Sequence, residues 1–421
     1  MRPGLSRIRR ILALLDHPEK DFRSILVTGS NGKGTTCAVL ASCLHGFGWN
    51  TGLFTSPHLV SVRERFRVNG ECASRAAMHE FLRRHGADCR RLGATYFETT
   101  RAFALWWFRR REVEWAVLEI GLGGRYDACN AVDPSLSIVT SIALEHTQWL
   151  GRTQAQIAAE KGCVARRDAP TLSGSLGKSA ERSLYRTVKA RGGYTLRLGH
   201  DILVSHAQSR ARGGSLTLQC FGETLDLDVR IPGRKALDNA ALAAAAAMHA
   251  CRVMHPKRWP AGWKHTLRTG VRRARWPARF EQVQAAPQIV VDVAHNAASV
   301  AALVTDWQAF WPKRRPVLLA GMLDDKPARV IGRLFSKIAS VAVITRPQSS
   351  RAIEPGELVR QWRRHFQRVE AVPGPRAALR RALELAGKHG ALLVAGSHYV
   401  VGPILAGLGV DPARGSIHSK Q

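Results

Sequence analysis

The feature that most constrains the fold is a glycine-rich turn between a predicted strand and a predicted helix. Residues 24–28 form a short apolar run, residues 28–36 read Thr-Gly-Ser-Asn-Gly-Lys-Gly-Thr-Thr, and residues 36–47 have a helical pattern. Glycines let backbone N–H groups approach phosphate oxygens, and a helix N-terminus adds positive potential. The turn therefore predicts a phosphate-binding loop in which Lys33 reaches the phosphates. A plain glycine-rich turn is the alternative interpretation.

Short apolar runs and helical patterns alternate after this turn. We expect strands at residues 51–55, 115–120 and 136–142, and a helix rich in aromatic side chains at residues 96–110. This alternation predicts an α/β fold with a doubly wound, mostly parallel sheet. Residues 171–232 alternate apolar and polar side chains instead, which predicts a small antiparallel addition with one solvated face.

A second series of strands begins near residue 288, after a predicted Ala-rich helix at residues 238–251. The series predicts a smaller, Rossmann-like αβ domain in the C-terminal part of the chain. We place the boundary at the basic stretch 272–277, which divides the chain into an N-terminal domain, residues 1–273, and a C-terminal domain, residues 277–421. The functional site is expected in the crevice between the two domains.

The charge balance favours anionic partners. Lys plus Arg number 63 and Asp plus Glu 32, so the formal net charge is +31. A nucleic-acid-binding protein on a phosphate-loop scaffold is therefore one function class, but the basic residues are spread along the chain without a reader motif. No window of about 20 residues is continuously apolar, so no membrane span is expected. The eight cysteines include no CxxC pair, which favours reduced thiols in a cytoplasmic protein.

Three side chains that suit a metal follow predicted strands. Ser56 comes after residues 51–55, Glu119 lies at the end of residues 115–120, and His146 follows residues 136–142. Because ligands of an open α/β sheet bind at the carboxyl edge of its strands, we expect these side chains to lie together. Mg²⁺ prefers a few protein oxygens together with phosphates and water. The alternative for Glu119 is an N-cap or an ion pair, and the alternative for His146 is a core histidine.

Several ordered motifs then resemble one family. They are Thr-Ser-Pro-His-Leu at 55–59, Glu-Arg-Phe-Arg-Val-Asn-Gly at 64–70, Glu-Ile-Gly-Leu-Gly-Gly-Arg-Tyr-Asp-Ala-Cys-Asn at 119–130, Thr-Ser-Ile-Ala-Leu-Glu-His-Thr-Gln-Trp-Leu-Gly at 140–151 and Ala-Glu-Lys-Gly at 159–162. The chain resembles the folylpolyglutamate synthases and dihydrofolate synthases, which are Mur-type ATP-dependent amide ligases. The resemblance implies that residues 1–273 are a Mur-ligase-type ATP-binding (P-loop) domain and residues 277–421 the ligase domain.

The resemblance also implies roles for individual residues. The nucleotide would bind to Asn31, Gly32, Lys33, Gly34, Thr35, Thr36, Asn239, Arg279 and Asp292. Magnesium would bind to Ser56, Glu119 and His146, and a carbamylated Lys161 would support a second magnesium. Lys33, Lys161 and His295 would take part in catalysis, with His295 near the incoming glutamate or the reacting carboxylate. A monovalent cation belongs to the same expectation.

The acceptor would lie against the aromatic helix and a second segment, through Thr95, Tyr96, Phe97, Glu98, Tyr126, Asp127 and Ala128. The implied reaction joins L-glutamate to 7,8-dihydropteroate and to reduced folates through an acyl phosphate, with ATP as co-substrate and a monomeric, cytoplasmic enzyme. A Mur-type ligase for another carboxylate is the alternative. Ordinary helix core is the alternative for the aromatic helix, and an N-cap is the alternative for Asn296.

The chain departs from the family pattern at several positions. Glu145 stands where an aspartate is usual before the histidine, and Ala278 stands where a glycine is usual. Alanine there matters if the backbone needs a positive φ. We expect Arg234 and Asn239 just before the Ala-rich helix. If Lys161 is not modified, the alternative is a surface lysine or an ion pair, such as one with Glu160. Relatives carry a further helical segment before residues 4–7, so part of the pteroate pocket is expected to be missing.

Overall fold

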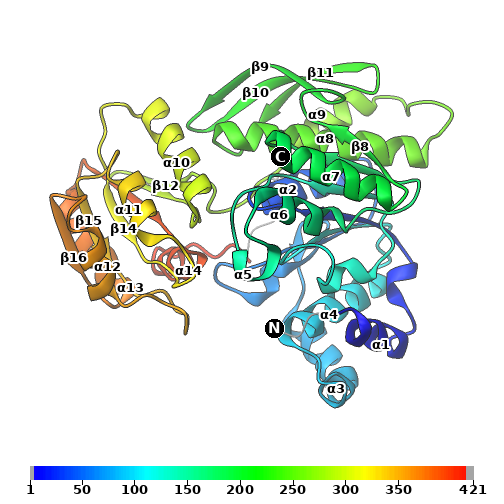
Figure 1. Ribbon diagram of the computed structural model, residues 1–421, viewed down its shortest axis with the longest axis horizontal. Coiled ribbons are helices and arrows are strands. Elements are labelled where there is room, and N and C mark those ends of the chain that lie inside the picture. Colours follow the sequence, from blue (N-terminus) through cyan, green and yellow to red (C-terminus); the bar gives the residue numbers. More distant parts are fainter. Residues whose placement is uncertain (1–3, 414–421) are drawn as a thin grey trace.

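The computed structural model describes residues 4–413 of the chain. Strands in this part of the chain form an eight-stranded, a three-stranded and a six-stranded sheet. Figure 1 shows the six-stranded sheet and its helices, yellow to red, beside the blue and green N-terminal part, with helix α14 (His398–Gly407) between them. The predicted α/β class is confirmed.

The eight-stranded sheet has the order β4-β3-β2-β5-β1-β6-β7-β8. The pairs from β2 through β5, β1, β6 and β7 to β8 are parallel. Strand β3 pairs antiparallel with β2, and β4 pairs antiparallel with β3. In sequence, the strands are β1 (Arg23–Thr28), β2 (Thr51–Phe54), β3 (Phe66–Val68), β4 (Glu71–Cys72), β5 (Trp115–Glu119), β6 (Leu136–Val139), β7 (Pro170–Ser173) and β8 (Tyr194–Arg197).

Helices cover both faces of this sheet, as a parallel sheet requires. Successive side chains of a strand point to opposite faces, so Ile25 and Val27 of β1 pack in one core and Leu26 in the other. The first core includes α2 (Lys33–Gly46), α8 (Arg234–Met254) and α9 (Trp263–Arg273). The second includes α1 (Ser6–Leu14), α3 (Arg75–Arg91) and α4 (Tyr96–Arg110).

The region 171–232 differs from its prediction. Its first strands, β7 and β8, extend the parallel sheet, joined by α7 (Lys178–Ala190). Only β9 (Leu203–Arg210), β10 (Gly213–Cys220) and β11 (Glu223–Val229) form the antiparallel addition, which packs one apolar face on the core of α8. The prediction was too broad because β8 is an edge strand, and its partial exposure produces a mixed apolar and polar pattern.

The six-stranded sheet has the order β12-β13-β17-β14-β15-β16, parallel except for β12. Its strands are β12 (Glu281–Ala285), β13 (Gln288–Val291), β14 (Val317–Ala320), β15 (Val341–Ile344), β16 (Arg368–Ala371) and β17 (Ala391–Ala395). One face packs on α10 (Ala297–Phe310), α11 (Ala328–Phe335) and α12 (Pro355–Trp362), and the other on α13 (Pro375–Ala386) and α14. This is the predicted Rossmann-like arrangement.

Short helices complete the described chain. They are α5 (Thr147–Leu150), α6 (Gln154–Gly162) and the 3-10 turns η1 (Pro18–Lys20), η2 (Val62–Arg65) and η3 (Ala128–Ala131). Within residues 4–413, no helix has the length and apolar character to cross a membrane. The division into domains 1–273 and 277–421 stays a prediction, and its outer ends, 1–3 and 414–421, lie outside the described residues.

Candidate active site

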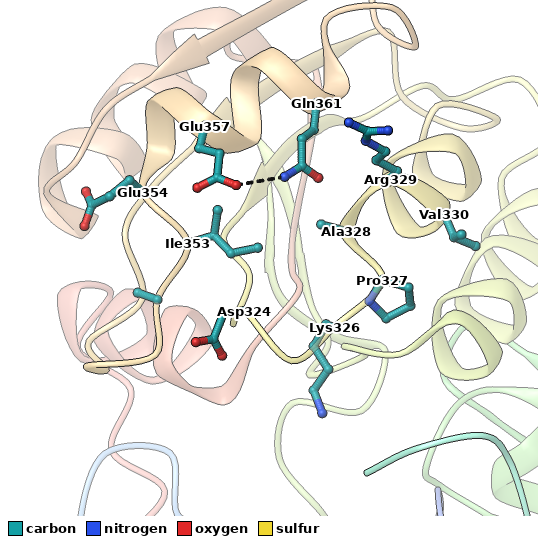
Figure 2. A pocket seen from close by; sticks show the side chains of 11 residues that line it. Asp324, Lys326, Pro327, Ala328, Arg329, Val330, Ile353, Glu354, Glu357 and Gln361 are labelled. Carbon is teal, nitrogen blue, oxygen red and sulfur yellow. Dashed lines mark hydrogen bonds between the residues drawn. The ribbon is translucent and has the colours of Figure 1, made fainter. Parts of the chain in front are cut away.

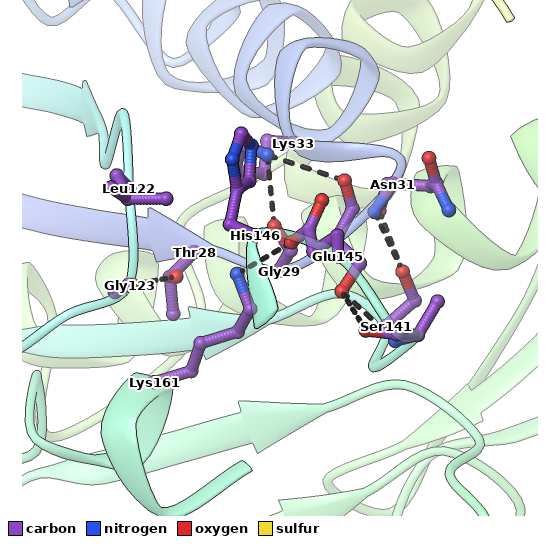
Figure 3. A network of polar contacts seen from close by, with 12 residues as sticks. Thr28, Gly29, Asn31, Lys33, Leu122, Gly123, Ser141, Glu145, His146 and Lys161 are labelled. Carbon is purple, nitrogen blue, oxygen red and sulfur yellow. Dashed lines mark hydrogen bonds and ion pairs between the residues drawn. The ribbon is translucent and has the colours of Figure 1, made fainter. Parts of the chain in front are cut away.

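The predicted phosphate loop lies between β1 and α2. Gly29 and Gly32 have positive φ angles of 145° and 89°, and a Cβ at either position would collide with Thr140 or with Asn239. Glycine alone avoids both the backbone strain and the collision. Gly32 is the N-cap, so helix α2 starts at Lys33 and not at the predicted residue 36. Lys33 Nζ donates to the carbonyl oxygen of Gly29, 2.8 Å away, and so curls over the loop (Figure 3).

The glycine that follows the lysine has a packing reason. A Cβ on Gly34 would lie 2.6 Å from Nε1 of Trp276, which belongs to the segment between α9 and β12. Thr35 and Thr36 follow inside the helix and are buried. Thr36 Oγ1 has no hydrogen-bond partner among residues 4–413. Trp276, which lies between the two halves of the chain, therefore packs against the start of α2 at Gly34.

Asn31 connects the loop to both halves. Its N–H donates to Ser141 Oγ at 2.9 Å, and its side-chain oxygen accepts from Asn296 Nδ2 at 2.8 Å. Asn296 also caps α10, as the structural alternative predicted. A residue of the C-terminal part thus reaches the phosphate loop directly.

Asn239 faces the loop from a helix. Helix α8 begins at Arg234, so Arg234 and Asn239 lie within it, and the expectation that they precede it was wrong. The helix starts early because Gly233, with φ of 99°, makes the turn and Asp306 of α10 accepts the Arg234 N–H at 3.1 Å. The early start brings the Asn239 side chain against Gly32.

Glu119 and Ser56 meet at the carboxyl edge of the sheet, as predicted. Glu119 ends β5, and its Oε2 accepts the N–H of Ser56 at 2.9 Å. Burial raises the pKa of Glu119, although the nearby ammonium of Lys33 lowers it. Within residues 4–413, no three His, Cys, Asp or Glu side chains are arranged so that they could hold a metal ion together. A carboxylate beside a serine at the phosphate loop nevertheless fits Mg²⁺, which needs few protein oxygens.

His146 does not follow a strand directly. Strand β6 ends at Val139, and His146 is the N-cap of α5, with a φ of 45°. Beyond the strand, the Thr140 N–H still donates to the Thr28 carbonyl of β1 at 2.9 Å, and the hydroxyls of Thr140 and Ser141 donate to the carbonyl oxygen of Asn31 in the phosphate loop. His146 Nδ1 lies 3.9 Å from Asp325 of the C-terminal part. Burial, and then the charge of Lys326, lower the pKa of His146, which favours a neutral ring able to bind a metal.

Lys161 is buried and pairs with Glu145. Nζ lies 3.0 Å from Glu145 Oε1, and the side chains are 2% and 8% exposed (Figure 3). Burial lowers the pKa of Lys161, while Glu145 acts in the opposite direction. The expected pairing with Glu160 was wrong, because Glu160 pairs with Arg125 at 3.2 Å. The longer carboxylate at position 145 therefore has a defined partner, and carbamylation of Lys161 stays a prediction.

Arg279 and Asp292 hold a strained turn in the C-terminal part. Ala278 has a φ of 54°, so the positive angle considered from the sequence is present. Asp292 accepts the N–H groups of Phe280 at 2.7 Å and Ala294 at 2.6 Å. Burial raises the pKa of Asp292 to about 6 against the opposing charge of Arg279. Their predicted contacts with a nucleotide stay predictions.

His295 offers one ring nitrogen to the site. Nδ1 lies 2.7 Å from the carbonyl oxygen of Val293, which can only accept, so Nδ1 carries the proton. Burial, followed by the charge of Lys326, lowers the pKa of His295 to about 4. The ring is therefore neutral near pH 7, with Nε2 as an acceptor. The ring of His398 lies 5.7 Å away.

The predicted acceptor residues divide into two kinds. Thr95 and Glu98 form the capping box of α4, and Asp127 pairs with Arg101 at 3.3 Å. These polar groups are engaged within the protein, and Ala128 is buried. The exposed members are the rings of Tyr96, Phe97 and Tyr126, each more than half exposed. Exposed rings at the start of α4 can stack on an aromatic ligand.

A separate pocket of about 420 Å³ lies between α11 and α12 (Figure 2). Its lining includes Glu357 and Gln361, which are hydrogen-bonded at 3.2 Å, and Lys326 points away from them. None of the site residues predicted from the sequence lines this pocket. The candidate active site is therefore the meeting point of the two halves around Lys33.

Sequence reasoning missed Trp276 at this meeting point, because no local pattern marks it as a neighbour of Gly34. Glu145 was noted from the sequence only as a departure from the family pattern, and the structure supplies its partner, Lys161. Lys326 also belongs to this meeting point, since its charge lowers the pKa values of both His146 and His295.

Two family models match the chain. The Mur ligase middle domain matches residues 27–247, and the Mur ligase glutamate ligase domain matches residues 278–398. A probable bifunctional folylpolyglutamate synthase/dihydropteroate synthase of Haloferax volcanii is 35% identical over 95% of this chain, which spans 48% of that protein's length. A dihydrofolate synthase/folylpolyglutamate synthase of Escherichia coli is 32% identical over 77% of this chain and 72% of its own length.

Solved structures agree with these relatives. Mycobacterium tuberculosis folylpolyglutamate synthase complexed with ADP has a TM-score of 0.92 and 25% identity, covering 98% of this chain and 96% of its own. The E. coli FolC structure with DHPP and ADP has a TM-score of 0.85 and 27% identity, covering 97% of this chain and 94% of its own. The chain therefore belongs to the Mur ligase family and, within it, to the dihydrofolate synthase/folylpolyglutamate synthases.

Proposed function

We propose that the protein is an ATP-dependent ligase that joins L-glutamate to 7,8-dihydropteroate and to reduced folates. The observation that carries the proposal is the convergence of both halves on one loop. Lys33 starts α2 and Glu119 ends β5 in the N-terminal half, and Asn296 reaches Asn31 from the other half at 2.8 Å. The relatives support folates over another carboxylate, because their names describe folate ligases and one solved relative holds DHPP with ADP.

In the first step, an acceptor carboxylate oxygen attacks the γ-phosphorus of ATP. The bond from the γ-phosphorus to ADP breaks, and an acyl phosphate forms. Lys33 exchanges its bond to the Gly29 carbonyl for phosphate oxygens, and the N-terminus of α2 adds positive potential. Arg279 donates to the phosphates with its planar fork. These cations stabilise the charge that develops on the transferred group.

Ser56 and Glu119 would hold Mg²⁺, with His146 as a further ligand, and the ion when bound neutralises phosphate charge. The Ser56 N–H, which donates to Glu119 Oε2 at 2.9 Å, orients this carboxylate. A second magnesium through a carbamylated Lys161, and a monovalent cation, complete the proposal. For the second magnesium, Lys161 would have to leave its present ion pair with Glu145.

In the second step, the amine of L-glutamate attacks the acyl carbon. Phosphate leaves, and the amide forms as the nitrogen of the neutral amine loses one of its two protons and keeps the other. His295 Nε2, unprotonated near pH 7, accepts a hydrogen bond from the incoming amine. Closure of the two halves around the loop excludes water, which would hydrolyse the acyl phosphate.

The test is glutamate-dependent release of ADP, with Mg²⁺ and either dihydropteroate or tetrahydrofolate as acceptor. Turnover with both acceptors supports the bifunctional ligase, and turnover with tetrahydrofolate alone restricts the proposal to polyglutamylation. Lys33→Ala should abolish turnover with either acceptor. ATP binding without turnover on either acceptor, in a folded protein, would overturn the proposal.

The state and location of the enzyme are part of the proposal. We propose a cytoplasmic monomer that acts on small molecules. All eight cysteines are free thiols, and seven of them are buried. Sedimentation of the purified protein, which gives its mass in solution, tests the monomer directly.

A further inference from the structure

Helix α10 of the C-terminal part contacts the N-terminal part at two points. Its N-cap, Asn296, donates to Asn31 of the phosphate loop at 2.8 Å. Further along the helix, Asp306 Oδ1 accepts the backbone N–H of Arg234, the first residue of α8, at 3.1 Å. Because a helix rises about 1.5 Å per residue, the two contacts lie roughly 15 Å apart along α10. One helix therefore spans both contacts.

The contact at Asp306 is closely fitted. The residue is 9% exposed, and a Cβ on Gly233 would lie 2.8 Å from its Oδ2. Gly233 also has a φ of 99°, which side chains other than glycine rarely adopt. The Arg234 side chain pairs with Asp238 at 2.6 Å, so Asp306 meets Arg234 through the backbone N–H. Glycine at position 233 therefore makes room for this carboxylate.

Electrostatics also connects Asp306 with the nucleotide site. Burial raises the pKa of Asp306, while the Arg234 N–H and the charges of Arg234 and Lys235 lower it. Burial and, more weakly, the charge of Asp306 raise the pKa of Asp292, one of the residues expected to contact the nucleotide. Asp306 is thus linked to that site by its charge as well as by its hydrogen bond.

Helix α8 carries the contact to the phosphate loop. An N–H in the first turn of a helix has no acceptor within the helix, so Asp306 supplies one for Arg234. Asn239 lies in the next turn, and helix geometry bonds its N–H to a carbonyl oxygen of the first turn. The Asn239 side chain lies against Gly32. Because Gly32 follows Asn31, both contacts of α10 lead to adjacent residues of one loop.

We propose that Asp306 is a positioning residue for the nucleotide, which it orients through α8 and Asn239. The proposal rests on the proposed function, in which Asn239 contacts ATP. Asp306 keeps the first turn of α8 wound, and the wound turn holds the Asn239 amide against Gly32. Nucleotide binding at the phosphate loop therefore depends on how the C-terminal part sits against α8.

The test measures the Kd of ADP by calorimetric titration for Asp306→Ala, Asp306→Asn and Ser74→Ala. We expect Asp306→Ala to raise the Kd about threefold to tenfold, the effect of one hydrogen bond. Asp306→Asn keeps an oxygen that accepts the Arg234 N–H and removes only the charge, so it should restore the Kd of the unchanged protein. Ser74→Ala is the matched control, because Ser74 accepts the Ala77 N–H at 3.1 Å as the N-cap of α3, which carries no predicted site residue. Its Kd should not change.

A double-mutant cycle shows whether Asp306 acts through Asn239. Asn239→Ala alone should raise the Kd of ADP at least as much as Asp306→Ala. In the Asn239→Ala background, Asp306→Ala should then have no further effect. Additive effects, or a Kd that Asp306→Ala leaves unchanged, would overturn the inference. An equal rise in Ser74→Ala would overturn it too, because loss of any helix cap would then be sufficient.

The remaining outcomes are also decisive. If Asp306→Asn binds ADP as weakly as Asp306→Ala, the bond to Arg234 has no role and the inference is wrong. If Asp306→Ala does not fold, Asp306→Ser, whose hydroxyl ends one bond short of the carboxylate oxygens, should raise the Kd in the same way, and an unchanged Kd would refute the inference.

The failure of the proposed function is a separate result. Binding of ADP without turnover on dihydropteroate or tetrahydrofolate would refute the ligase, while the Kd values would still decide the role of Asp306. If Asn239→Ala leaves the Kd of ADP unchanged, the nucleotide contact of Asn239 and the inference fail together.

Discussion

The buried pair of Glu145 and Lys161 supports a quantitative stability prediction. Lys161→Met keeps most of the side-chain length but leaves the Glu145 carboxylate buried without the ammonium 3.0 Å away. Removing one partner of a buried pair costs about 3–5 kcal/mol. Burial raises the pKa of Glu145, but Lys161 and then Lys33 lower it from 4.5 to about 2. At about 1.4 kcal/mol for each pKa unit, this shift corresponds to roughly 3 kcal/mol, in agreement.

The sign of the pH dependence follows from the lowered pKa. Because the folded state holds the Glu145 pKa below its unfolded value, the stabilisation is fully present above the unfolded pKa of 4.5 and is lost as the pH falls toward about 2. The difference in unfolding free energy between Lys161→Met and the unchanged protein should therefore be constant from pH 6 to 8 and shrink below pH 4.5.

Urea denaturation followed by tryptophan fluorescence measures this difference at pH 7. The double variant Glu145→Gln with Lys161→Met should cost less than the sum of the single variants, because it leaves no unpaired charge. Glu160→Gln is the control, since its partner Arg125 is half exposed and such pairs contribute about 0–1 kcal/mol. The reasoning is refuted if Lys161→Met costs no more than Glu160→Gln, or if the two single effects add.

The same experiment separates the two chemical forms of Lys161. A carbamate is negative, so beside Glu145 it would repel, and Glu145→Gln would then stabilise the protein. We expect this reversal in bicarbonate-saturated buffer if Lys161 is carbamylated, and destabilisation in carbon dioxide-free buffer. Destabilisation of equal size in both buffers would contradict carbamylation under these conditions.

Three further predictions concern the loop and its neighbours. Gly32→Ala should abolish ADP binding in an equilibrium titration, because its Cβ meets Asn239 at a φ of 89°, and should cost at least about 1–2 kcal/mol in urea denaturation. Asn296→Ala should lower the unfolding free energy by about 0.5–2 kcal/mol, because α10 loses its N-cap. It should also raise the KM for ATP, because the 2.8 Å hydrogen bond to Asn31 is lost. Asn296→Asp can still cap the helix but cannot donate to Asn31, so it should restore the stability but not the KM. Because burial lowers the pKa of His295 to about 4, the pH profile of kcat/KM should show no ionisation of this ring between pH 6 and 8. A change of kcat/KM with pH in that range that disappears in His295→Gln would contradict the assignment.

The elements found from the sequence are those buried on both faces. Strands such as β5 and β17 read as continuous apolar runs because helices cover them on either side. The phosphate loop was also recognisable, because glycine is required where φ is positive and the backbone is crowded. Edge strands were less clear. An exposed face mixes polar side chains into the pattern, so β8 was taken as part of the antiparallel addition.

The sequence by itself determined the α/β class, the loop and the residue types available for phosphate and metal chemistry. Only the tertiary structure decided their partners. Asn31 meets Asn296, which lies 265 residues later, and Lys161 pairs with Glu145 and not with its neighbour Glu160. The physical reason is that periodicity determines which face of an element a side chain occupies, whereas a contact between elements depends on how sheets and helices pack.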